Sequence, residues 1–161
     1  MTRWCLDTEF NEDGRTIELI SIGLVSEFGD ELYFESSEFD HDACQPWVKE
    51  NVFPYLQGGD CVHSRVEIAG AIALATKQRV GKPEFWAYFA DYDWVVLCQL
   101  YGRMVDLPSH FPMYCLDLKQ EMVRRVIDKG SLPKQIGVAH NALEDARWVN
   151  DALTWIERST H

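Results

Sequence analysis

Two acidic residues, Asp7 and Glu9, lie two positions apart directly after the apolar run Trp4-Cys5-Leu6. The apolar run is typical of a buried strand. Alternate side chains of a strand face the same way, so both carboxylates are expected on one face, roughly 7 Å apart along the backbone. At about 4 Å and an effective dielectric of about 20 they would repel by ~4 kcal/mol, so the pair needs a proton, a cationic partner or a metal ion. Mg²⁺ and Mn²⁺ prefer carboxylate oxygen, which makes this pair a candidate metal site; the alternative is a strand that simply ends in solvent.

A third acid lies where a predicted strand is followed by a predicted helix, within residues 89–97. Ligands of open α/β sheets usually bind at such junctions. Asp91 fits as the N-cap of the helix. Asp93 starts a stripe with Val96 and Leu97 and would emerge from the buried face of the helix. Periodicity alone leaves both aspartates open.

A histidine and an acid five positions apart, His140 and Asp145, complete the candidate set. His140 is expected in the loop before the last helix. Asp145 is expected in the first turn or two of that helix, on the face of Ala142 and Val149. A histidine before a helix is more often a cap or a packing residue than a catalyst, and an aspartate in a first turn usually complements the helix dipole.

The elements that must position these residues form a mixed pattern. Residues 17–26 and 32–35 alternate like strands and follow the first strand after tight turns, one of them at 11–14, which predicts an antiparallel meander. Helices and strands then alternate, which predicts a mixed sheet flanked by helices. We expect later strands at 84–88 and 113–116, a short helical stretch from residue 45, a helix at 66–75 begun by Ser64, and helices at 91–101, 118–129 and 142–158. The fold class is thus α/β, with a mixed five-stranded sheet in which an antiparallel meander comes first and parallel strands follow, flanked by helices, in one domain over residues 1–161.

Composition narrows the function classes. A net charge of −11 argues against a protein that coats long nucleic acid, but it allows an enzyme that grips one or two terminal nucleotides, with few phosphate contacts and a shallow salt dependence. Five scattered cysteines predict reduced thiols. No apolar run reaches the ~18 residues needed to span a bilayer and no signal peptide is evident, so we expect a cytoplasmic protein without a membrane partner.

Taken in order, the acids and the histidine resemble the DEDDh group of DnaQ-like 3′-to-5′ exonucleases, which have a ribonuclease-H-like fold. The resemblance selects Asp93 over Asp91 and extends over nearly the whole chain. The residues that carry it are Leu6-Asp7-Thr8-Glu9, Ile20-Ser21-Ile22-Gly23, Tyr92-Asp93 with Leu97, and His140-Asn141-Ala142 with Asp145. The stretches 4–10 and 86–89 are most similar to the small stand-alone exoribonucleases of mycobacterial type.

The resemblance implies roles for these residues. Asp7, Glu9, Asp93 and Asp145 would bind two divalent cations, Mg²⁺ or Mn²⁺, and His140 would be the general base. The products would be nucleoside 5′-monophosphates, released from the 3′ end of single-stranded or overhanging RNA. Phe10 is a candidate for nucleotide binding by stacking on the terminal base, with a packing role equally open.

Two departures from the family pattern concern the substrate. Phe10-Asn11-Glu12 stands where the proofreading subgroup has Thr-Thr-Gly, and Phe89 replaces the usual Asn of the second motif. Both argue against DNA. An exodeoxyribonuclease and a non-catalytic nucleotide-binding module of the same fold stay open as alternatives. A phosphatase of the haloacid dehalogenase type is disfavoured because it needs Asp-x-Asp.

Two questions about partners stay open in the sequence. Stand-alone members of the group are often homodimers, so a homodimer is a further expectation. Basic residues within 119–134 are either an RNA-facing patch or the solvated face of a helix. They are Lys119, Arg124, Arg125, Lys129 and Lys134.

Overall fold

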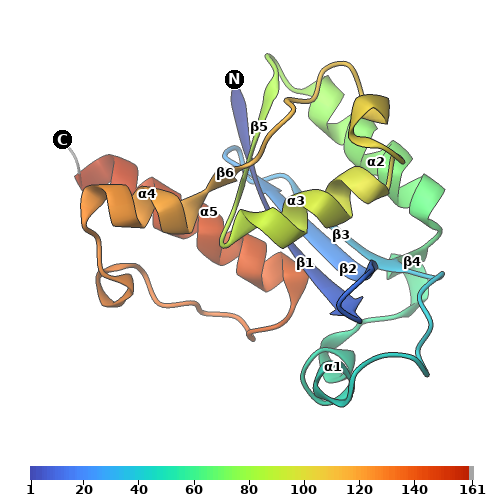
Figure 1. The fold of residues 1–161 in the computed structure, drawn as a ribbon. Coiled ribbons are helices and arrows are strands. Elements are labelled where there is room, and N and C mark those ends of the chain that lie inside the picture. Colours follow the sequence, from blue (N-terminus) through green and yellow to red (C-terminus); the bar gives the residue numbers. More distant parts are fainter. Residues whose placement is uncertain (160–161) are drawn as a thin grey trace.

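A computed structural model describes residues 1–159; the last two residues of the predicted domain, Thr160 and His161, lie outside the described residues. Within the described range, six strands form one mixed sheet in the order β4-β3-β2-β1-β5-β6 (Figure 1). Their bounds are β1 (Thr2–Glu12), β2 (Ile17–Ser26), β3 (Glu31–Ser36), β4 (Val62–His63), β5 (Pro83–Ala87) and β6 (Leu116–Asp117). The longest strand, β1, therefore lies near the middle of the sheet.

The predicted antiparallel meander followed by parallel strands is confirmed. β1 pairs antiparallel with β2 and β2 with β3, whereas β5 runs parallel to β1 and β6 parallel to β5. The sheet has one strand more than expected, because the two-residue β4 is too short to give a periodic signal. The last predicted strand at 113–116 is shifted and forms only at Leu116–Asp117.

The first strand is longer than the sequence indicated. Residues 11 and 12, expected in a turn, still pair with β2, after a bulge between Glu9 and Phe10. The turn itself is closed by Asp13, whose Oδ1 accepts hydrogen bonds from the backbone N–H groups of Arg15 and Thr16. The candidate acids Asp7 and Glu9 consequently lie inside a paired strand.

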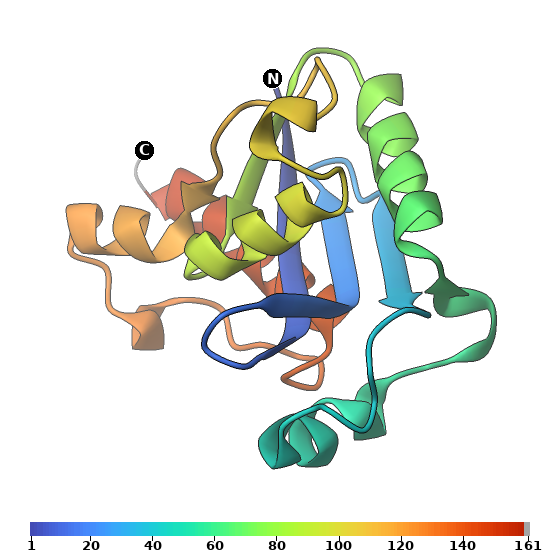
Figure 2. The same ribbon diagram turned by 45° about the vertical axis from the view of Figure 1, so that its right-hand side comes forward.

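Helices cover both faces of the sheet. Figure 2 shows α3 crossing one face of β1, with α5 behind that strand. The helices are α1 (Pro46–Asn51), α2 (Arg65–Gln78), α3 (Ala90–Gln99), α4 (Leu118–Arg125) and α5 (Ala142–Ser159). The predicted start of α2 is confirmed by a capping box between Ser64 and Glu67. α4 ends four residues earlier than expected, because Val126 adopts a left-handed conformation with φ 57°.

Alternation along β1 separates two cores. Trp4 and Leu6 pack with residues of α2 and α3 on one face, whereas Cys5 packs with residues of α4 and α5 on the other. Side chains of one parity share a face, so Asp7 and Glu9 point to the α5 side, while Thr8 points to the α3 side.

One edge of β1 is left open where the acids lie. β5 pairs only with residues Thr2 to Cys5 of β1. From Leu6 onward β5 provides no partner on this side, and the chain leaving β5 turns into α3. The candidate acids thus lie just beyond the carboxyl end of β5, the place where open α/β sheets commonly bind ligands.

All five cysteines are free thiols, as predicted. None of the helices in residues 1–159 combines the length and the apolar character that crossing a bilayer requires.

Candidate active site

The first two acids occupy the middle of β1. Asp7 lies opposite Gly23 and Glu9 opposite Ser21 in the pairing with β2. Glu9 is buried and Asp7 is partly buried. Both line a cavity of about 670 Å³ that also contains Asp93, His140 and Asp145. Residues far apart in the chain therefore meet at one place.

Asp93 is the aspartate of the second motif that enters this cavity. It is 5% exposed, whereas Asp91 is exposed and is not the cap of its helix, because α3 starts at Ala90 with Phe89 in the N-cap position. Asp93 Oδ1 accepts two hydrogen bonds from Thr8, one from the backbone N–H at 2.8 Å and one from Oγ1 at 2.6 Å. The open edge of β1 thereby anchors the third acid beside the first two.

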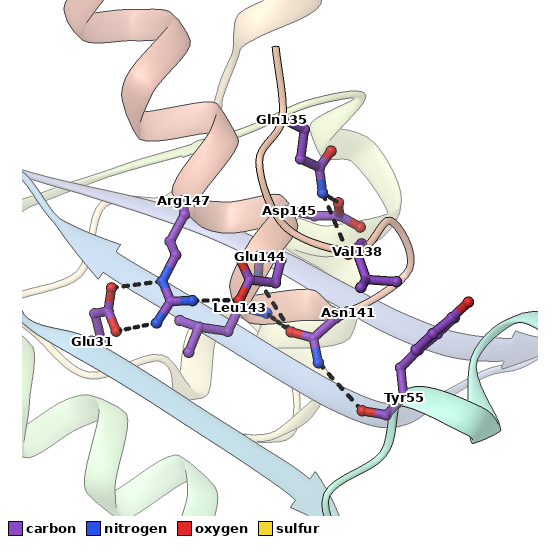
Figure 3. Close-up of polar contacts among 9 residues, drawn as sticks. All are labelled: Glu31, Tyr55, Gln135, Val138, Asn141, Leu143, Glu144, Asp145 and Arg147. Carbon is purple, nitrogen blue, oxygen red and sulfur yellow. Dashed lines mark hydrogen bonds and ion pairs between the residues drawn. The ribbon is translucent and has the colours of Figure 1, made fainter. Parts of the chain in front are cut away.

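Asp145 and His140 reach the cavity from the start of α5. The backbone N–H of His140 donates to Asp145 Oδ2 at 3.0 Å. The side-chain amide of Gln135 donates to Asp145 Oδ1, as Figure 3 shows. Each oxygen of Asp145 is thus held by a donor. His140 precedes the helix, as predicted, and has a left-handed backbone with φ 64°. Its ring meets Trp47 of α1 edge to face, with centroids 4.9 Å apart.

The start of α5 is fixed by its own cap and by a close contact with the sheet. Asn141 Oδ1 accepts from the backbone N–H groups of Leu143 and Glu144, each at 3.2 Å, and its amide nitrogen donates to the carbonyl of Tyr55 at 3.4 Å (Figure 3). Gly23 of β2 packs directly against Ala142 and Leu143, so that a Cβ there would lie 2.4 Å from the nitrogen of Leu143. Gly23 therefore allows α5 to approach β2 closely.

Electrostatics make the carboxylate cluster hard to ionise. Burial, and then the charges of Asp93, Glu9 and Asp145, raise the pKa of Asp7 well above its ordinary value. Burial, Asp145 and Asp93 raise the pKa of Glu9 to about 8. The pKa of Asp93 is raised to about 6, mainly by burial and against the two Thr8 hydrogen bonds. Burial also raises the pKa of Asp145. A bound cation would relieve this cost.

The donor set fits a hard divalent cation. Ligand atoms of Glu9, His140 and Asp145 lie within 4.8 Å of one another, and the carboxylates of Asp7 and Asp93 line the same cavity. Carboxylate oxygens are the ligands that Mg²⁺ and Mn²⁺ favour. This group of three residues includes His140, which was predicted to be the general base and not a metal ligand.

Aromatic rings form part of the rim. Phe10 and Tyr92 stack in parallel, with ring centroids 5.6 Å apart and an interplanar angle of 6°. Phe89, with φ 59°, places a ring that is 58% exposed at the cavity. Phe10 thus lines the cavity and also packs on Tyr92, which fits both the stacking role and the packing role predicted for it.

Several residues of the site were not found from the sequence. Thr8 lies between the two acids of β1 and was given no role, although the alternation of side chains along a strand places it on the face that packs with α3. Gln135 lies in a segment without periodicity. Asp117 caps α4, and its Oδ1 accepts from the N–H of Gln120 at 3.1 Å. Its other oxygen accepts from the N–H of Ala90 at 2.9 Å and thereby also holds the start of α3.

Comparison with known proteins identifies the family. A family model described as a 3′-5′ exoribonuclease Rv2179c-like domain matches residues 2–156. The chain belongs to the Rv2179c-like 3′-5′ exoribonuclease family. The 3′-5′ exoribonuclease Rv2179c of Mycobacterium tuberculosis (strain ATCC 25618 / H37Rv) is 40% identical over 150 residues, which are 90% of this chain and 87% of that protein.

Solved structures agree on the fold of this exoribonuclease family member. Pop2p of S. pombe, in a form with bound Mg²⁺ and Mn²⁺, superposes with a TM-score of 0.67 at 15% identity, over 96% of this chain and 82% of that one. Exonuclease I of Methylocaldum szegediense gives a TM-score of 0.66 at 15% identity, over 98% of this chain and 40% of that one. The ribonuclease-H-like fold expected from the motifs is confirmed.

Proposed function

We propose that the chain acts as a single-domain, metal-dependent 3′-to-5′ exoribonuclease that releases nucleoside 5′-monophosphates. The observation that carries the proposal is the convergence of Asp7, Glu9, Asp93, Asp145 and His140 in one cavity. Membership of an exoribonuclease family supports RNA as the substrate, and the relative that is 40% identical carries the same activity in its name.

The four acids are proposed to hold two ions, Mg²⁺ or Mn²⁺. Their raised pKa values support this, because the protein has gathered carboxylates that cannot all ionise together without a counter-charge. When bound, the ions would supply positive charge to the phosphoryl oxygens of the scissile phosphodiester. The hydrogen bonds from Thr8, Gln135 and His140 keep Asp93 and Asp145 directed into the cavity.

His140 is proposed as the general base. Its imidazole would accept a proton from the attacking water while a new oxygen–phosphorus bond forms and the bond from phosphorus to the 3′ oxygen breaks. The leaving 3′ oxygen takes up a proton and stays on the shortened RNA, and the terminal nucleotide departs with its 5′-phosphate. The contact with Trp47 and the hydrogen bond from the His140 backbone to Asp145 support a fixed position for the imidazole.

A digestion experiment tests this proposal. Single-stranded RNA with a free 3′ hydroxyl, the same RNA with a 3′ block, and matching single-stranded DNA are incubated with Mg²⁺, Mn²⁺ or EDTA. We expect 5′-monophosphates from the free RNA only, and only with a divalent ion. Cleavage of blocked RNA, or release of inorganic phosphate, would contradict the proposal.

The remaining alternatives correspond to distinct results of the same experiment. Preferential digestion of DNA would indicate an exodeoxyribonuclease, and nucleotide binding without turnover would indicate a non-catalytic module.

We also propose a homodimer, by analogy with stand-alone relatives of this group. Light scattering of the purified chain tests this directly, and a monomeric mass would refute it.

A further inference from the structure

The proposed substrate is a polyanion, whereas the protein is strongly acidic. Its net charge is −11, and four carboxylates line the cavity. Bound divalent ions would neutralise charge at the phosphate being cleaved. The phosphodiesters upstream of it would still be repelled by the negative charge of the protein. RNA binding in such a protein requires cationic side chains placed where those phosphates pass.

Two lysines meet this requirement. Among the described residues, Lys129 and Lys134 are the only lysine or arginine side chains that line the cavity. Both belong to the segment between α4 and α5, drawn in orange in Figures 1 and 2. This segment forms one wall of the cavity. Phe10 of β1 and Tyr92 of α3 form part of its rim.

Lys129 is held in place without being neutralised. Its ammonium group lies 5.0 Å from the ring centroid of Tyr88 and 5.1 Å from that of Trp148, and both rings line the cavity. A cation above aromatic faces is attracted by the ring quadrupoles but keeps its full charge. The group is therefore positioned and available to an anion.

Lys134 is exposed, and its ammonium group forms no hydrogen bond or ion pair within residues 1–159. The other basic residues of 119–134 differ. Arg124 and Arg125 both form ion pairs with Glu121, and Lys119 does not line the cavity. Of the five basic residues within 119–134, only Lys129 and Lys134 therefore fit an RNA-facing patch at the cavity.

We propose that Lys129 and Lys134 form a binding subsite for the phosphodiesters upstream of the 3′-terminal nucleotide of single-stranded RNA. This inference rests on the proposed function and adds a second region of substrate contact outside the carboxylate cluster. Two cations predict a shallow salt dependence, with a slope of about −1.4 in a plot of log affinity against log salt, from roughly −0.7 per contact on single strands.

The test compares Lys134→Ala with Lys77→Ala, which removes an exposed lysine of α2 outside the cavity. Both variants and the wild type are assayed on an RNA pentamer and on the p-nitrophenyl ester of uridine 5′-monophosphate, which has no upstream phosphodiester. We expect Lys134→Ala to raise KM for the pentamer about fivefold, the size of one lost exposed ionic contact, and to leave the ester unchanged. Lys77→Ala should change neither.

A second variant and a binding measurement complete the test. Lys129→Ala should raise KM for the pentamer in the same way, and the double variant should lower the salt slope of pentamer binding, measured by fluorescence anisotropy with Ca²⁺, by about 1.4. Circular dichroism checks that each variant is folded.

The possible contrary results separate the two proposals. Normal RNA digestion by the wild type, with Lys134→Ala unchanged on the pentamer, overturns the subsite and leaves the exoribonuclease proposal intact. An equal loss on pentamer and ester places the lysines at the cleaved phosphate and also overturns the upstream assignment. A wild type that neither binds nor digests RNA overturns both proposals.

Discussion

Thr8 lies between the two acids of β1 and donates both its backbone N–H and its hydroxyl to Asp93. The residue that separates the first two acids along the chain thus positions the third. Since Thr8 is buried and points to the face of β1 on which α3 packs, it connects the two sides of the sheet at the candidate site.

Replacing Thr8 by valine keeps the side-chain shape and removes the hydroxyl donor. We expect kcat on RNA to fall about tenfold because Asp93 loses one of the two donors that orient it, and the free energy of unfolding to fall by about 1 kcal/mol. Thr76→Val is the matched control, since Thr76 is equally buried but bonds to the carbonyl of Ile72 in α2. Equal kcat values for the two variants would contradict a positioning role.

Substitution of Gly23 tests the close approach of α5 to the sheet. A Cβ at Gly23 would clash with the backbone of Ala142 and Leu143, so Gly23→Ala must shift the start of α5 and with it His140 and Asp145. We expect a more than tenfold loss of kcat and a loss of about 1 to 3 kcal/mol of stability. Gly70→Ala in α2, where a Cβ meets nothing within 4 Å, should leave activity intact and stabilise slightly.

Replacing His140 by alanine separates catalysis from metal binding. As a general base, His140 contributes roughly 10²- to 10⁴-fold to the rate, so turnover should fall by that factor. Calorimetric titration with Mn²⁺ should show retained binding if His140 is only a base. A large loss of Mn²⁺ affinity would instead make His140 a ligand, which its distance from Glu9 and Asp145 allows. His41→Ala, at an exposed residue outside the cavity, is the control.

Removal of the Phe10 ring tests the base-stacking role. Phe10→Ala should raise KM for RNA about tenfold, within the range of roughly 1 to 3 kcal/mol for stacking of one base. Phe28→Ala removes a ring that is 65% exposed and lies outside the cavity, and it should have no effect. An unchanged KM in Phe10→Ala would show that the ring serves only to pack against Tyr92.

Some residues of this site could be predicted from the periodicity of strands and helices, and others only from the resemblance to a family. Asp7 and Glu9 were placed on one face because a strand has a fixed period of two, and the structure keeps that period through both residues. The local pattern placed His140 and Asp145 at the start of the last helix, but only the resemblance to a family gave them a role in the site. The choice between Asp91 and Asp93 needed the resemblance to a family, since both lie in the first turn of α3.

The parts that sequence reasoning missed have no periodicity. The wall formed by the segment between α4 and α5 consists mostly of irregular chain, so nothing in the pattern placed Gln135 beside Asp145 or Lys134 at the cavity. The two-residue strand β4 pairs with the end of β3 through contacts distant in sequence. Such features depend on tertiary packing, which local spacing does not encode.

The raised pKa values predict how stability depends on pH without metal. Glu9 has a pKa of about 8 in the folded protein against an ordinary 4.5, so between these values the folded state holds a proton that the unfolded chain has lost. Its stabilising contribution is complete below about pH 4.5 and is lost as the pH rises through about 8. In EDTA, the melting temperature should therefore fall between pH 6 and pH 8.

Added Mn²⁺ should reverse this fall, because the ion replaces the protons and binds only the folded cluster. Saturation to 100 times the dissociation constant corresponds to about 2.7 kcal/mol of stabilisation, and the gain should be larger at pH 8 than at pH 6. Thermal unfolding of the wild type and of Glu9→Gln, with EDTA and with Mn²⁺, measures both effects. In Glu9→Gln the melting temperature should fall less between pH 6 and pH 8. The substitution removes the carboxyl group whose pKa is raised by burial and by acidic neighbours. An identical pH dependence in the two proteins would mean that Glu9 is already ionised in the folded metal-free state.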